Sequence, residues 1–225
     1  YYLGDLYRSF ERGKRINERL GGMERVTVDD MRLLQLDNFS YLAALALPVM
    51  LENLRLDELS AREKEMAHSL ARWDYQNLGR DVAPSIFHHW WDRLYETIWK
   101  ELRGAAHPVR IPSAERTLQM IVEEPESVWY DDADTPRVET LSELVTQTFH
   151  EAVKGLESEM GEEWSGWKWG EVNKTRLDHI AEIPGLGGPE LFTDGSAESL
   201  NAIRTHHGPS WRMVVELGPE LKAYG

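Results

Sequence analysis

Residues 81–100 read DVAPSIFHHWWDRLYETIWK, and this stretch decides the class of fold. Its main apolar residues recur at i, i+4, i+7 and i+11: Phe87, Trp91, Leu94 and Ile98. This spacing matches the 3.6-residue period of an α-helix with one apolar face. Pro84 suits the first turn of such a helix, with Asp81 before it as the expected cap. The stretch therefore predicts an amphipathic helix that buries aromatic side chains.

Further helices are predicted upstream of this stretch. Thr27 and Asp30 have the spacing of a capping box, and the helix that they open should run toward Pro48. Residues 41–51 form the longest apolar run, which is too short to span a membrane and indicates a buried helix. Residues 61–73 show a second amphipathic pattern.

Downstream, the chain changes character after Gly161. A helix is expected from about Leu141, with Gly155 suited to its end. The WKWG segment at residues 167–170 alternates in the manner of a strand, and WRMVVEL at residues 211–217 is the best predicted strand. The sequence thus predicts a mainly α chain with a small β portion at the C-terminal end. We divide it into a helical part, residues 1–160, and a mixed part, residues 161–225.

Composition restricts the classes of partner. The 225 residues include 39 acidic and 25 basic side chains, for a formal net charge of −14. This balance opposes binding to nucleic acid or to anionic lipid, whose phosphates require clustered Lys and Arg. The chain contains no Cys, which excludes a thiol nucleophile, disulfides and thiolate metal sites. We therefore expect no nucleic-acid partner and no membrane partner.

Motifs for self-sufficient catalysis are not found in the sequence. It contains no G-x-S-x-G elbow, no P-loop, no H-E-x-x-H and no G-x-G-x-x-G. His88 and His89 point about 100° apart on a helix and favour packing over a shared metal. The acidic residues Asp131, Asp132 and Asp134 suit either calcium binding or a solvated loop, and the base rate for charge runs favours the loop.

Several short motifs follow one another along nearly the whole chain. They are, in order, DLYRSF (residues 5–10) followed by Arg15 and Ile16, DDM (29–31) with LQLDNFS (34–40), LARWD (70–74), FHHWWDRL (87–94), WKWG (167–170), GS (195–196) with LNA (200–202), and GPSWRM (208–213). Together and in this order they resemble the β-chain of penicillin acylases (penicillin amidases), a family of self-processing N-terminal-nucleophile hydrolases.

The resemblance implies an activity and a fold. Members of the family hydrolyse amide bonds with a Ser that autocleavage places at the start of the β-chain, where its own α-amine acts as base. An Asn side chain and backbone N–H groups stabilise the oxyanion. That Ser and that Asn would both lie before Tyr1, so we expect an internal or C-terminal piece of a four-layer αββα protein, inactive alone.

The same resemblance implies partners and a location. The expected partners are the remainder of the acylase, that is, its α-chain and the N-terminal part of its β-chain, and a small N-acyl amide substrate such as a β-lactam or an acyl-homoserine lactone. No cofactor is required, although some members hold a structural calcium ion. Members are usually exported, which implies a periplasmic or secreted protein.

Two residues correspond to functional positions of the family. Arg15 matches an arginine that lies near the active site and helps to organise it; the alternative is a surface charge beside Arg12 and Lys14. Asp5 matches a carboxylate that binds calcium in some members; the alternative is an ordinary aspartate at a helix start. A different class of function is also open, namely a non-catalytic, acidic helical interaction module.

Overall fold

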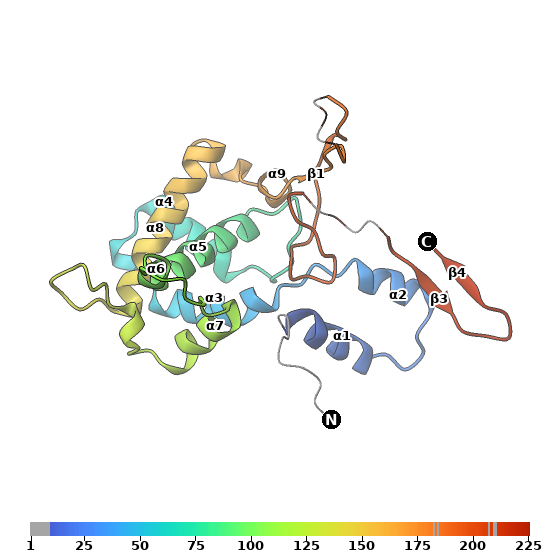
Figure 1. Ribbon diagram of the computed structural model, residues 1–225, viewed down its shortest axis with the longest axis horizontal. Coiled ribbons are helices and arrows are strands. Elements are labelled where there is room, and N and C mark those ends of the chain that lie inside the picture. Colours follow the sequence, from blue (N-terminus) through green and yellow to red (C-terminus); the bar gives the residue numbers. More distant parts are fainter. Residues whose placement is uncertain (1–9, 182, 184, 207, 209–210) are drawn as a thin grey trace. The chain divides into compact units, whose positions relative to one another are not determined.

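The computed structural model describes most of the chain, namely residues 10–181, 183, 185–206, 208 and 211–225. The chain forms two compact units, each built from segments that are distant in the sequence (Figure 1). The first unit consists of Tyr1–Tyr41, Tyr75–Asp81 and Trp169–Gly225. The second unit consists of Leu42–Asp74 and Val82–Lys168.

Helices make up the second unit. They are, in chain order, α3 (Tyr41–Asn53, whose first residue belongs to the first unit), η1 (Leu56–Glu58), α4 (Ala61–Ala71), α5 (Ala83–Ile98), α6 (Lys100–Arg103), α7 (Ala114–Glu123), η2 (Val128–Tyr130), α8 (Leu141–Met160) and η3 (Trp164–Gly166). Helix α5 packs along α8, and α4 packs against α5 (Figure 1).

The core of the second unit lies between α5 and α8. Trp90 of α5 is fully buried, and its Nε1 donates to the carbonyl oxygen of Val145 at 3.0 Å. Its ring meets that of Phe149 edge to face, with centroids 4.7 Å apart. The four apolar residues predicted to face the core are buried as well: Phe87, Trp91, Leu94 and Ile98. Because burial of such large side chains is strongly favourable, this pair of helices anchors the unit.

Two predicted helix ends in the second unit were wrong. Val82 rather than Asp81 is the N-cap of α5, and it makes no side-chain cap hydrogen bond. Helix α8 runs through Gly155 and ends at Met160, and its C-cap Gly161 has a positive φ of 88°, which glycine adopts without strain. A glycine inside a helix costs about 1 kcal/mol relative to alanine, which the tertiary packing of the long helix α8 outweighs.

Short helices and two hairpin-like strand pairs form the first unit. The described elements are α1 (Glu11–Gly21), α2 (Val28–Gln35), α9 (Trp169–Val172), β1 (Thr175–Arg176), β2 (Glu190–Leu191), β3 (Val214–Glu216) and β4 (Lys222–Tyr224). Strand β1 pairs antiparallel with β2, and β3 pairs antiparallel with β4. The strand predicted at residues 211–217 is confirmed as β3, in a shorter form.

The helix predicted to run from Thr27 toward Pro48 is two helices. The capping box at its start is confirmed, since Thr27 Oγ1 accepts from the backbone N–H of Asp30 at 3.2 Å. However, α2 ends at Gln35, and the next helix begins at Tyr41. Between them Asp37 accepts the N–H of Phe39, a local side-chain bond that competes with helical hydrogen bonding.

The sequence predicts a strand at the WKWG segment, but the structure shows no strand there. Its second tryptophan, Trp169, opens the short helix α9, and its Nε1 donates to the carbonyl oxygen of Gly195 at 2.6 Å. Gly170 lies against the ring of Phe192, which leaves no room for a Cβ atom. The segment therefore owes its conformation to residues far along the chain rather than to its own alternation.

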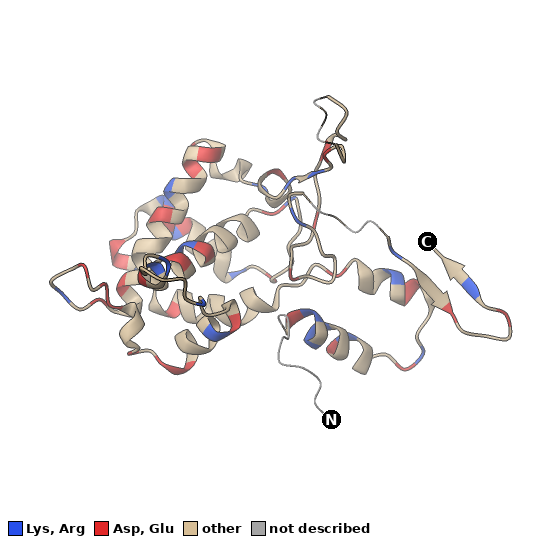
Figure 2. Ribbon diagram, in the orientation of Figure 1, with Lys and Arg blue, Asp and Glu red and all other residues tan. Residues whose placement is uncertain are grey.

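The observed fold is mainly α with a few short strands, as the sequence predicts. All described strands lie in residues 161–225, although residue 160 as a domain boundary stays a prediction. Figure 2 shows Asp and Glu spread over the helices of both units with Lys and Arg between them. Among the described helices, none combines the length and apolar content needed to cross a bilayer.

Candidate functional site

Arg15, the residue that the sequence singles out, projects from α1 onto the loop between α2 and α3. Its Nε lies 3.0 Å from both carboxylate oxygens of Asp37, and its Nη2 lies 2.7 Å from Oδ2. The Arg15 side chain is 14% exposed and that of Asp37 is 9% exposed. This forked contact holds the guanidinium in one orientation, which a single point contact would not achieve.

Aromatic and acidic side chains complete the surroundings of Arg15. The ring of Phe39 lies under the guanidinium, with its centroid 4.3 Å from Cζ. Glu18 Oε2 accepts from Arg15 Nη1 at 3.1 Å and from the hydroxyl of Tyr41 at 2.5 Å. The hydrogen bonds from Tyr41 and Arg15 lower the pKa of Glu18, while burial and the bond to Glu18 raise the pKa of Tyr41. Glu18 is therefore ionised and Tyr41 protonated at neutral pH.

The geometry leaves Arg15 able to donate further hydrogen bonds. A guanidinium carries five N–H groups, and the contacts to Asp37 and Glu18 use Nε and one N–H on each terminal nitrogen. Among the contacts of the described residues, one N–H on Nη1 and one on Nη2 remain for an oxygen of another group. The arrangement thus suits an orienting and charge-stabilising role rather than proton transfer, because arginine stays protonated.

A buried polar network supports the loop that carries Asp37. The backbone N–H of Asn201 donates to the carbonyl oxygen of Asp37 at 2.9 Å, and its Nδ2 donates to Asn38 Oδ1 at 2.8 Å. Ser199 Oγ donates to the carbonyl oxygen of Asn38 at 3.2 Å and accepts from Asn77 Nδ2 at 3.2 Å. Buried polar groups persist when each has a partner, so this network fixes the backbone on which Asp37 sits.

The sequence placed Asp37, Asn38 and Asn201 in motifs but assigned them no role. All three residues belong to the motifs LQLDNFS and LNA that carry the family resemblance. The pairing of Asp37 with Arg15 could not be predicted from these motifs, because the two residues lie 22 positions apart and no local sequence pattern marks the contact. Asp5, the other predicted site residue, lies outside the described residues, and calcium binding there stays a prediction. Among the residues that the structure describes, no group of three His, Asp or Glu side chains is arranged to hold a metal ion.

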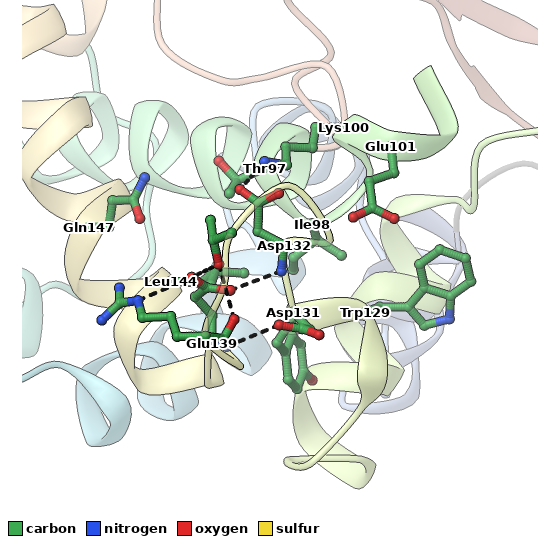
Figure 3. A pocket seen from close by; sticks show the side chains of 13 residues that line it. Thr97, Ile98, Lys100, Glu101, Trp129, Asp131, Asp132, Glu139, Leu144 and Gln147 are labelled. Atoms are coloured by element: carbon green, nitrogen blue, oxygen red, sulfur yellow. Dashed lines mark hydrogen bonds and ion pairs between the residues drawn. The ribbon is translucent and has the colours of Figure 1, made fainter. Parts of the chain in front are cut away.

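A pocket of about 350 Å³ lies beside α5 and α8 in the second unit (Figure 3). Its charged residues are Lys100, Glu101, Asp131, Asp132, Arg137 and Glu139. Lys100 pairs with Asp132, while Asp131 Oδ1 accepts the backbone N–H of Glu139 at 3.2 Å. Each carboxylate in the pocket thus has a partner within the protein, and these contacts hold the loop at residues 131–139 in place.

Glu139 makes this loop sensitive to acid. Hydrogen bonds from Thr135 Oγ1 and from the backbone N–H of Asp132 lower the pKa of Glu139 from 4.5 to about 2. A lowered pKa in the folded state contributes stability that is present above pH 4.5 and is lost as the pH falls toward 2. We expect Glu139→Gln to make the loss of stability between these pH values shallower, measured as urea midpoints from pH 2 to 7. Glu126→Gln, at an exposed position, is the control, and equal pH profiles for the two variants would contradict the assignment.

A second cluster has the residue types of a catalytic triad without its order. Ser60 Oγ contacts Glu63 Oε2 at 2.7 Å, and His150 Nδ1 contacts Glu63 Oε1 at 2.6 Å. The carboxylate stands between the hydroxyl and the imidazole, so the histidine has no path by which to accept the Ser60 proton. Ser60 and Glu63 form instead the capping box of α4.

The histidine pair on α5 is also structural. His89 Nδ1 lies 3.0 Å from the carbonyl oxygen of Ser85, and His89 Nε2 lies 3.5 Å from Glu159. Burial lowers the pKa of His88 to about 3, which keeps that ring neutral at physiological pH. His89 thus has partners within the protein, as a packing site requires.

Comparison with known proteins places the whole chain in one family. No curated protein matches the chain. The sequence model of the family described as penicillin amidase matches residues 1–225, which covers the Arg15–Asp37 pair and the Asn38–Asn201 network. The chain thus belongs to the penicillin amidase family, whose members are amide hydrolases.

Proposed function

We propose that this chain is the supporting part of an amide hydrolase that acts on small N-acyl amides, such as β-lactams or acyl-homoserine lactones. The observation that carries the proposal is the family match along all 225 residues. The fixed guanidinium of Arg15 in the first unit adds to it, because an oriented cation is useful where negative charge develops during acyl transfer. The α-chain and the N-terminal part of the β-chain are the proposed partners.

In this proposal the nucleophile comes from residues outside this chain. Acyl transfer to a side chain needs a hydroxyl next to a base. The Ser60–Glu63–His150 cluster of the second unit has the wrong order for this purpose. The N-terminal Ser of the family, with its own α-amine as base, would then supply the reacting oxygen.

An activity assay of the chain alone tests whether the nucleophile lies outside it. The purified 225-residue chain is incubated with a chromogenic acyl amide, in parallel with the complete processed enzyme. The expected result is turnover by the complete enzyme and none by the chain. Turnover by the isolated chain that survives repurification would refute the proposal, as would a complete enzyme that cleaves no acyl amide.

The role proposed for Arg15 is to organise the reaction centre. Arg15→Lys in the complete enzyme keeps the charge but loses the forked contact with Asp37. We expect kcat to fall about tenfold or more, which corresponds to about 1.4 kcal/mol, while KM changes little. Arg12→Lys, at an exposed position of the same helix, is the matched control. Circular dichroism of each variant ensures that only folded enzyme is compared, and full kcat in folded Arg15→Lys would contradict the role.

Calcium binding by Asp5 and export to the periplasm or the medium are proposals drawn from the family. The chemistry proposed for Arg15 depends on neither of them.

A further inference from the structure

Arg212 is a cation without a carboxylate partner in the described part of the chain. It precedes β3 in the first unit, and its Nη2 donates to the side-chain oxygen of Asn201. Its side chain is half-buried, and no Asp or Glu of the described residues lies within ion-pair distance. Burial lowers the pKa of Arg212.

This situation is unusual within the molecule. The chain has 39 acidic side chains for 25 basic ones, so acidic partners are abundant. Other partly buried arginines have them: Arg15 contacts Asp37 and Arg62 contacts Glu157. Removing a cation from water without a nearby anion costs free energy. The contact of Arg212 in the described part of the chain is the neutral side-chain amide of Asn201.

Asn201 holds the guanidinium in place. Asn201 is 7% exposed and is itself fixed by hydrogen bonds to Asp37 and Asn38. Its Oδ1 is therefore a stationary acceptor for Nη2, while four of the five N–H groups of Arg212 stay unused by the described residues. A planar guanidinium fork with free donors matches a carboxylate, which accepts two parallel hydrogen bonds.

A series of contacts through Asn201 and Asp37 connects Arg212 to Arg15. Arg212 contacts Asn201, Asn201 contacts the backbone of Asp37, and the carboxylate of Asp37 holds Arg15. The two arginines differ in their state. Arg15 is paired with Asp37 and Glu18, whereas Arg212 has no carboxylate partner among the residues that the structure describes.

We propose that Arg212, oriented by Asn201, is a binding site for the carboxylate of a small molecule. The proposal rests on the proposed amide hydrolase function in one respect, namely that the small molecule is a substrate or a product. Hydrolysis of an amide always releases a carboxylic acid, so an enzyme of this class meets carboxylates at each turnover. The other source of the same chemistry is an Asp or Glu side chain elsewhere in the complete protein.

Binding to the 225-residue chain provides a test that does not depend on activity. Sodium acetate is titrated at constant pH and ionic strength while the Nε–Hε resonances of arginine are followed by nitrogen–proton NMR, with acetamide as the neutral analogue. We expect one arginine resonance to shift saturably with acetate only. The shift is lost in Arg212→Gln and kept in Arg204→Gln, an exposed arginine of the same unit. The absence of a saturable shift, or its persistence in Arg212→Gln, would overturn the proposal.

Kinetics of the complete enzyme distinguish the two sources of the carboxylate. Two chromogenic amides are compared that differ only in a carboxylate replaced by a carboxamide. Arg212→Gln is expected to raise KM about tenfold or more for the charged substrate and less than twofold for the neutral one, and Arg204→Gln should change neither. Equal effects on both substrates overturn the carboxylate site for the substrate. Acetate binding that is seen in the 225-residue chain but not in the complete enzyme assigns the carboxylate to the protein and also overturns the small-molecule site.

The two proposals fail in different ways. If the complete enzyme cleaves neither amide, the proposed function is wrong. The acetate titration then tests by itself whether Arg212 binds a carboxylate. An enzyme that cleaves both amides with no selective effect of Arg212→Gln keeps the proposed function and removes the carboxylate site for its substrate.

Discussion

Trp90→Ala is expected to lower the free energy of unfolding by about 4 kcal/mol, as deletion of a large buried side chain does. Trp90 is fully buried between α5 and α8, contacts Phe149 and donates to the carbonyl oxygen of Val145. Its removal leaves a cavity at the main helix–helix contact of the second unit. Urea unfolding followed by far-UV circular dichroism measures the loss.

Two further variants separate the causes of that loss. Trp90→Phe retains most of the apolar surface and removes the indole donor, so it should cost about 1 kcal/mol for the hydrogen bond plus a small cavity. Trp129→Ala removes a tryptophan that is 39% exposed and should cost far less than Trp90→Ala. Equal losses for Trp90→Ala and Trp129→Ala would contradict the assignment of the core to the contact between α5 and α8.

Gly195→Ala is expected to cost at least about 3 kcal/mol and to damage the first unit, since it forces both strain and a clash. Gly195 has φ of 92°, and a Cβ atom there would collide with the backbone oxygen of Asn201. The segment has little freedom to move away. The N–H of Gly195 donates to the carbonyl oxygen of Asn77 at 2.7 Å, and its own carbonyl accepts from Trp169 at 2.6 Å.

Gly161→Ala is the matched control for this prediction. Gly161 has φ of 88°, close to that of Gly195, but a Cβ atom there meets nothing within 4 Å. With ψ of 173° this backbone is one that only glycine adopts readily, so the variant should cost only that backbone strain, about 1–3 kcal/mol. The difference between the two variants in urea unfolding gives the contribution of the clash. If both variants lower the free energy of unfolding by the same amount, the close approach of Gly195 to Asn201 does not contribute to stability, and the prediction is wrong.

Helical faces were predictable because they depend on neighbours in the chain. Phe87 and Ile98 repeat at helical spacing, and a side chain at each of those positions points to the same side of the helix wherever the helix packs. The capping box of Thr27 and Asp30 is likewise formed by residues three apart. Such features need no tertiary partner, and the structure agrees with them.

Breaks and irregular segments were predicted poorly because distant residues determine them. The helix after Thr27 ends before Asp37, whose carboxylate is held by Arg15 from another helix. The alternation of WKWG resembled a strand, whereas Trp169 is held in a helical turn by a bond to Gly195. Nothing within either segment signals the distant group that decides its conformation.

The candidate site also has some features that the sequence predicts and others that only the tertiary structure determines. Family resemblance drew attention to Arg15 from sequence alone, and it placed Asp37 and Asn201 in motifs without connecting them. The contact between Arg15 and Asp37, the anchoring of Asp37 by Asn201 and the contact of Arg212 with Asn201, without a carboxylate partner among the described residues, are seen only in the folded chain. Residue order determines what a side chain is able to do and which face of its own helix it occupies. Its partner and its degree of burial follow from distant segments being brought together, and these decide whether a charge is neutralised or left available.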